Sequence, residues 1–132
     1  ELAALRGVDV RIITTGKPDS WPVYLAAFSY IDRLRETGIR FYAFEPGFLH
    51  EIVMLVDDYV STVGTPNFDN RSFRLNFEVT AMVVDEAFAG EMEAMFEADF
   101  AHSRPIDPAI MESKPFWWRL GVNISRLAAP VL

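Results

Sequence analysis

The chain has 132 residues, 51% hydrophobic and 14% aromatic, with 19 acidic and 12 basic side chains and a net charge of −7. This composition fits one cored domain, excludes a disordered or collagen-like chain, and argues against general binding of a nucleic-acid backbone. The absence of cysteine excludes disulfide scaffolds and thiolate sites, and no uncharged apolar run reaches the roughly 20 residues that span a bilayer.

Hydrophobic spacing and turn residues predict helices and strands that alternate along the chain. The expected elements are a helix end over 1–6, a strand over 8–13, a helix over 21–37, strands over 39–44, 50–57 and 59–63, a turn-rich loop over 64–70, a strand over 77–84, a helix over 86–101 and a helix opening at 115. The first of these is too short to form an independent helix, so we expect a chain truncated at its N-terminus that lacks its first strand.

The alternation predicts the α/β class, with a mixed β-sheet of five or six strands flanked by helices on both faces. We expect this domain to cover 1–103 and an aromatic, basic helical tail to cover 104–132. The helix over 86–101 carries acidic side chains and no basic one on its polar face. We interpret that face as solvated rather than as an acidic binding site.

The tail places two tryptophans beside basic residues. Trp117 and Trp118 directly precede Arg119, and Arg126 follows about two helical turns later. Tryptophan and arginine together suit the headgroup region of an anionic bilayer. A terminal helix docked on the domain's own core would show the same apolar periodicity. The sequence leaves both interpretations open, and periodicity alone favours the docked helix.

Several chemically active side chains follow one another along the predicted hairpin and its return strand. His50 stands near the start of an apolar strand and Asp57 follows it at the turn, while Thr65 and Asn67 lie in the next loop and Glu78 in the strand after that. A histidine alone at a strand edge is more often structural than catalytic. An imidazole, a hydroxyl, an amide and a carboxylate on one hairpin and its return strand can, however, surround a phosphate.

These positions resemble the HxKx4D motif of the phospholipase D superfamily, which a Gly-Ser-x-Asn loop and a later glutamate follow. The surrounding sequence looks like the second catalytic half of bacterial cardiolipin synthases over nearly the whole chain. The residues that carry the resemblance are His50, Asp57, Gly64, Thr65 in place of serine, Asn67 and Glu78. It implies a phospholipase D-like half-domain that requires no metal and no cofactor.

The resemblance implies phosphatidyl transfer between two phosphatidylglycerol molecules, giving cardiolipin and glycerol through a phosphohistidine. His50 would be one of two facing histidines, Glu78 would orient it, and Thr65 and Asn67 would donate hydrogen bonds to phosphoryl oxygens. Asp57 would hold the strand and loop. The expected partners are anionic phospholipid, a membrane surface and a second half from the same protein or a homodimer, with no nucleic acid. The expected location is the bacterial cytoplasmic membrane, peripheral for this segment, with any membrane span outside it.

Two residues depart from the motif. The lysine two residues after the histidine is Ile52 here, and Pro66 occupies a loop position where the family has a small residue. The first change removes a cation from the phosphate pocket and the second removes a backbone N–H donor. We therefore expect the isolated chain to be inactive or impaired. The alternatives are an inactive module that binds anionic lipid or a partner half, and a phosphodiesterase of the same superfamily.

Overall fold

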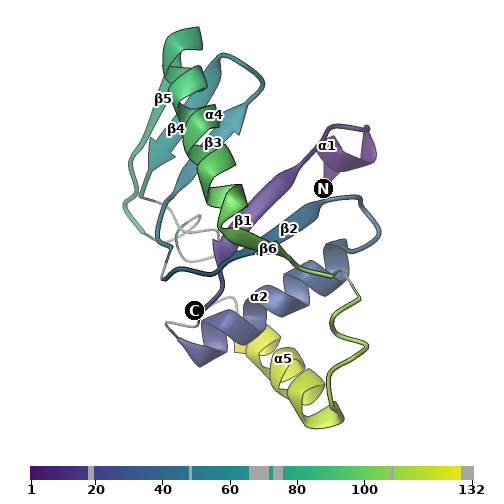
Figure 1. The fold of residues 1–132 in the computed structure, drawn as a ribbon. Coiled ribbons are helices and arrows are strands. Elements are labelled where there is room, and N and C mark those ends of the chain that lie inside the picture. The colour runs from purple at the N-terminus through teal and green to yellow at the C-terminus, as the bar shows by residue number, and fades with distance from the viewer. Residues whose placement is uncertain (18–19, 48, 66–71, 73–75, 108, 129–132) are drawn as a thin grey trace.

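The computed structural model describes residues 1–17, 20–47, 49–65, 72, 76–107 and 109–128 (Figure 1). The elements in chain order are α1 (Leu2–Leu5), β1 (Arg11–Thr15), α2 (Trp21–Leu34), β2 (Arg40–Phe44), β3 (Val53–Val56), β4 (Val60–Gly64), β5 (Thr80–Val84), α4 (Glu86–Ala101), β6 (Ser103–Pro105) and α5 (Phe116–Ala128). The mixed α/β class expected from the sequence is confirmed.

The strands form two three-stranded sheets instead of one larger sheet. Sheet A has the order β1-β2-β6, with β1 parallel and β6 antiparallel to the central β2. Sheet B is the antiparallel meander β3-β4-β5. Both edges of β2 are occupied by β1 and β6, so the hairpin that follows β2 pairs within itself and with its own return strand.

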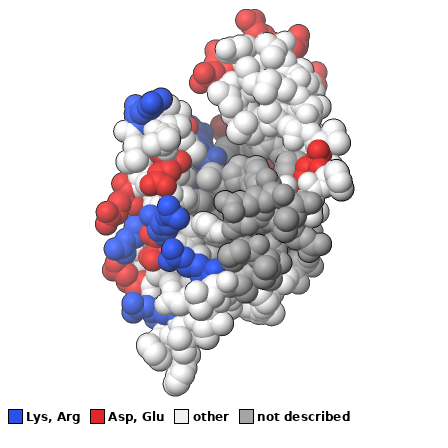
Figure 2. Space-filling model, turned by 180° about the vertical axis from the view of Figure 1, so that it is seen from behind, with Lys and Arg blue, Asp and Glu red and all other residues white. Residues whose placement is uncertain are grey.

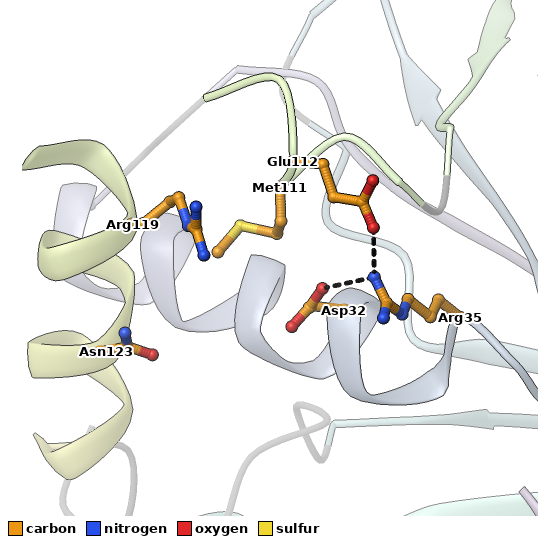
Figure 3. A pocket seen from close by; sticks show the side chains of 6 residues that line it. All are labelled: Asp32, Arg35, Met111, Glu112, Arg119 and Asn123. Atoms are coloured by element: carbon orange, nitrogen blue, oxygen red, sulfur yellow. Dashed lines mark hydrogen bonds and ion pairs between the residues drawn. The ribbon is translucent and has the colours of Figure 1, made fainter. Parts of the chain in front are cut away.

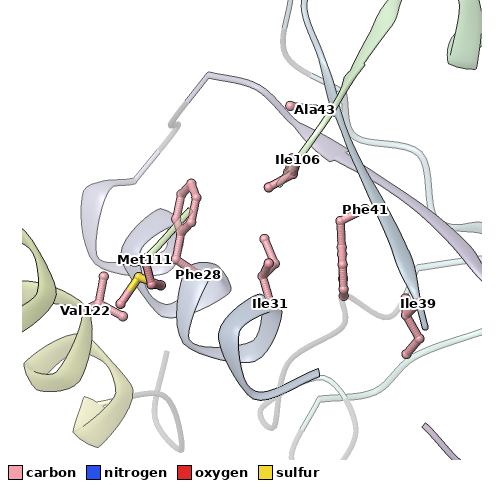
Figure 4. Packing of buried hydrophobic residues seen from close by; sticks show 8 residues of the cluster. All are labelled: Phe28, Ile31, Ile39, Phe41, Ala43, Ile106, Met111 and Val122. Carbon is pink, nitrogen blue, oxygen red and sulfur yellow. The ribbon is translucent and has the colours of Figure 1, made fainter. Parts of the chain in front are cut away.

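Helices cover both faces of sheet A because alternate side chains of β2 point to opposite faces. Phe41 and Ala43 are buried against Phe28 and Ile31 of α2 in the main core, shown in Figure 4. Tyr42 points the other way and meets Phe100 of α4 edge to face, with ring centroids 4.8 Å apart. The prediction of helices on both faces is therefore confirmed for sheet A.

Sheet B is covered on one side by α4 and exposed on the other (Figure 1). Ser61 of β4 is fully buried on the α4 side, where Ala89 and Met92 of the helix are also buried. The opposite face presents exposed apolar side chains, which are Met54, Val56, Met82 and Val84. The register pairs Met54 with Thr62 and Thr62 with Met82, so these side chains form a cross-strand row on the outer face.

The observed boundaries differ from the predicted ones mainly in the strands. α4 covers the predicted 86–101, and α2 begins at the predicted residue but ends at Leu34, ahead of Gly38 at φ +84°. The strand expected around 50–57 begins at Val53, and the one expected over 77–84 begins at Thr80. β6 was not predicted, because three residues ending in proline carry no strand periodicity.

Candidate functional site

Three of the predicted site residues belong to segments that meet at one end of sheet B. His50 precedes β3, Thr65 follows β4 and Glu78 precedes β5. In an antiparallel meander, the start of the first strand, the end of the second and the start of the third lie at the same end. The backbone bonds agree, since Gly64 N donates to Ile52 O at 2.9 Å and Thr65 N donates to Val79 O at 3.0 Å.

Thr65 and Glu78 are in direct contact at this end of the sheet. The Thr65 hydroxyl donates to Glu78 Oε2 at 2.5 Å, and Val79 N donates to the same hydroxyl oxygen at 3.1 Å. Hydrogen bonds from Thr65, then from Asn76 and Ser72, hold the pKa of Glu78 below its ordinary value, while desolvation acts in the opposite direction. Glu78 is therefore an ionised acceptor at neutral pH.

Ser72 and Asn76 were not assigned roles from the sequence, although both lie in the stretch that resembles the cardiolipin synthases. Ser72 is 5% exposed, so its hydroxyl is one of the few buried polar groups of the described residues. A buried hydroxyl that acts on a carboxylate is a positioning group. A single serine in a turn-rich stretch gives no signal of burial, which depends on the tertiary arrangement.

His50 lies in the segment that precedes β3, where its side chain is exposed. Ile52 follows it beside the end of β4 and is half-buried. The described stretches 49–65 and 76–102 contain no lysine or arginine. The cation that the motif would supply next to the histidine is thus missing from the described part of this end of the sheet.

The remaining predicted residues lie elsewhere. Asp57 is at the opposite end of the hairpin, in the turn between β3 and β4, where its φ of 52° is the left-handed conformation that aspartate tolerates in tight turns. This end of the hairpin is about four strand residues, or roughly 13 Å, from the Thr65–Glu78 contact. Asn67 and Pro66 fall outside the described residues. Among the described residues, no group of three or more acidic or histidine side chains is arranged to hold a metal ion.

Neither of two hollows found in the described part of the chain is lined by His50, Thr65 or Glu78. One, of about 310 Å³, lies between α2, α5 and the loop before α5, where Arg35 pairs with Glu112 at 2.8 Å and Asp32 at 3.9 Å (Figure 3). The other, of about 250 Å³, is lined by aromatic side chains at the carboxyl ends of β1 and β2. The predicted site is thus not enclosed by either hollow.

The two tryptophans of helix α5 point in different directions, one toward the domain and one toward solvent. Trp118 packs edge to face on Phe28, with centroids 4.8 Å apart, and the Lys114 ammonium lies 5.4 Å from its ring centre. Trp117 is 77% exposed, and Arg119 and Arg126 are also exposed. One face of α5, which contains Trp118, is therefore docked on the domain as the second interpretation expects. Membrane contact stays a prediction for the exposed face, which contains Trp117. None of the helices in the described ranges combines the length and apolar character needed to cross a bilayer.

Comparison with known proteins identifies the family of the chain. The family model described as "Cardiolipin synthase, PLD-like domain" matches residues 1–100. Proteins named cardiolipin synthase A are similar over 131 residues, with 48% identity in Pseudomonas aeruginosa strain LESB58, 46% in Pseudomonas putida strain W619 and 45% in Pseudomonas fluorescens Pf-5. These matches cover 99% of this chain but 27% of each relative. The chain belongs to the cardiolipin synthase family of phospholipase D-like domains.

Proposed function

We propose that this chain is the second catalytic half of a cardiolipin synthase, which transfers a phosphatidyl group from one phosphatidylglycerol molecule to another. The observation that carries the proposal is the Thr65–Glu78 contact at the end of sheet B from which the His50 segment also departs. Family membership and relatives named cardiolipin synthase A support the same activity. The products would be cardiolipin and glycerol.

The proposed reaction has two displacements at one phosphorus atom. A neutral imidazole nitrogen attacks the phosphorus, an N–P bond forms, and the bond from phosphorus to the glycerol oxygen breaks. A second histidine protonates the departing glycerol and then removes the proton from the incoming hydroxyl of a second phosphatidylglycerol. That hydroxyl displaces the histidine and gives cardiolipin. His50 would be one of these two histidines.

Glu78 would hold the ring of His50 by accepting the N–H on the nitrogen that does not react. Its lowered pKa keeps the carboxylate ionised and ready to accept this proton donor. Thr65 has a single hydroxyl proton, and that proton points to Glu78. Thr65 therefore positions Glu78 in this arrangement, and it would bind a phosphoryl oxygen only if its hydroxyl turned away.

The site needs a second histidine and a cation that the described residues do not supply. The chain spans 27% of the length of the relatives it matches, so we propose that the facing half comes from another part of the same protein or from a second copy. Such a protein would work at the surface of the bacterial cytoplasmic membrane, where its lipid substrates lie. Ile52 would reduce the rate by about a hundredfold or more, the usual loss for one missing electrostatic partner.

Restoring the lysine tests this proposal. The full-length protein with Ile52→Lys is incubated with phosphatidylglycerol labelled in its phosphatidyl part, and both cardiolipin and a covalent protein adduct are measured. We expect a gain of about a hundredfold or more over the unmodified protein. Met54→Lys is the matched control, because it adds the same charge two residues further along the strand, where the side chain is 46% exposed. It should give no gain.

Each other result has a defined meaning. An adduct that survives when His50→Gln is added to Ile52→Lys would show that His50 is not the nucleophile. Label released as phosphatidic acid would favour the phosphodiesterase alternative. If Ile52→Lys produced neither product nor adduct, the chain would be better described as an inactive module, which the missing cation at position 52 already favours as the second candidate.

A further inference from the structure

Helix α5 presents an exposed apolar surface in addition to the face that packs on the domain. The packed face contains Val122, which is 1% exposed, together with Trp118 and Ser125. The members of the outer surface, called here the α5 outer face, are Phe116, Trp117, Leu120, Ile124 and Leu127. Three of them, Phe116, Trp117 and Leu127, are more than 65% exposed.

The helical geometry separates α5 into three strips. At about 100° per residue, the α5 outer face covers an arc of roughly 100°, and the packed face lies on the far side of the helix. Arg119, Asn123 and Arg126 fall in the arc between the two and border the α5 outer face. A helix docked only through its core-facing residues would need polar side chains on its outer arc, so the aromatic and aliphatic residues there require another explanation.

The charges of the molecule favour an anionic partner at this end. The tail over 104–128 has four basic and two acidic side chains, whereas α4 has acidic side chains and no basic one. In Figure 2 Asp and Glu side chains lie at the upper end of the molecule, whereas Lys and Arg side chains lie along one side, with Asp and Glu side chains among them. The difference in charge between the tail and α4 would turn α5 toward a negatively charged surface and α4 away from it.

We propose that the α5 outer face lies in the plane of an anionic phospholipid bilayer, with its apolar side chains at the boundary between headgroups and acyl chains. Arg119 and Arg126, at the border of this face, would bind lipid phosphates, and Trp117 would occupy the headgroup level. Phe28 keeps Trp118 turned inward, which fixes the outward direction of this face. The proposal concerns lipid attachment alone and holds whether or not the site at sheet B is active.

Vesicle flotation with the full 132-residue chain tests the attachment. Vesicles of phosphatidylcholine with one third phosphatidylglycerol are compared with vesicles of phosphatidylcholine alone, and we expect binding to the anionic vesicles only. Leu120→Ser with Ile124→Ser should weaken that binding about tenfold or more, and Arg119→Gln with Arg126→Gln about fivefold for each charge. Circular dichroism confirms that each variant is folded.

Matched controls remove exposed apolar and basic groups elsewhere on the chain. Leu2→Ser with Leu5→Ser replaces two leucines of α1 that are 75% and 61% exposed, and Arg6→Gln removes an exposed charge outside the tail. These variants should bind as the unmodified chain does. Equal losses in both sets, or equal flotation with zwitterionic vesicles, would overturn the proposal.

A single cysteine distinguishes a bilayer from a protein as the partner of this face. Ile124→Cys, labelled with an environment-sensitive dye, introduces a unique thiol into a chain that has no cysteine. The fluorescence emission of the dye should shift to the blue when anionic vesicles are added to the labelled chain. The same shift should appear with the full-length protein labelled at the same residue. A blue shift already present without lipid, or a concentration-dependent dimer that Leu120→Ser abolishes, would show that protein covers the face and would overturn the proposal.

Discussion

Phe28 is the side chain that couples α2, sheet A and α5, so its replacement should cost more than that of any exposed aromatic residue on the same helix. It is 7% exposed and forms edge-to-face contacts with Tyr24 at 5.0 Å and Trp118 at 4.8 Å between ring centroids. Removing a buried phenylalanine ring costs about 3–5 kcal/mol of unfolding free energy. Each aromatic pair contributes roughly 0.5–1.5 kcal/mol beyond the buried area.

Two substitutions separate these contributions. Phe28→Ala should lower the free energy of unfolding by about 3–5 kcal/mol, whereas Phe28→Leu, which keeps most of the volume, should lose roughly 1–3 kcal/mol from the two ring contacts. Tyr30→Ala on the same helix is the control, since Tyr30 is 41% exposed and should cost less than about 1 kcal/mol. Urea titration followed by circular dichroism gives all three values. A Phe28→Ala loss no larger than that of the control would refute the packing argument.

Three further predictions concern backbone fit, capping and ionisation. Gly16→Ala should destabilise the chain by about 1–3 kcal/mol, because the added Cβ would lie 2.3 Å from the carbonyl oxygen of Phe44 in β2. Gly90→Ala in α4 is the control: its Cβ meets nothing within 4 Å, so the substitution should be neutral or stabilising. Thermal melts measure both variants. Asp85→Ala should cost about 1 kcal/mol in urea titration, since its carboxylate accepts a first-turn amide of α4 at 2.8 Å, and an unchanged midpoint would contradict the cap. The pKa of Glu78 in the folded chain, measured by carboxyl NMR, should lie below the ordinary value for glutamate. The stability that ionised Glu78 contributes is therefore complete at pH values above the ordinary pKa, and it is lost as the pH falls through the folded pKa. Thr65→Val should raise this pKa and Thr65→Ser should not, and equal pKa values in both variants would exclude the Thr65 hydroxyl as the cause.

Local signals predicted the helices better than the sheets. The limits of α4 follow from Asp85 as a cap and from an apolar stripe that runs without interruption, both of which are local. The division into two sheets depends on which strand edges are free, and periodicity carries no information about pairing partners. The sequence does not predict β6, because only its pairing with β2 makes this segment a strand.

The candidate site was predicted in part for the same reason. Residue order placed Thr65 and Glu78 next to the ends of adjacent strands, where the antiparallel pairing of β4 with β5 brings them into contact. The burial of Ser72 and the opposite directions of Trp117 and Trp118 depend on packing. Neighbouring residues of a helix point about 100° apart, so two adjacent tryptophans cannot share one environment once either is fixed against a core.

The outer face of sheet B has a consequence for how the chain behaves in solution. An apolar surface that remains open to water among the described residues is formed by Met54, Val56, Met82 and Val84. Covering such a surface releases free energy in proportion to the area removed from water, so self-association or attachment of another segment would add to the folding equilibrium by mass action. The temperature at which the isolated chain melts should accordingly rise with its concentration, and a soluble preparation should require dilution, a detergent or polar substitutions on this face.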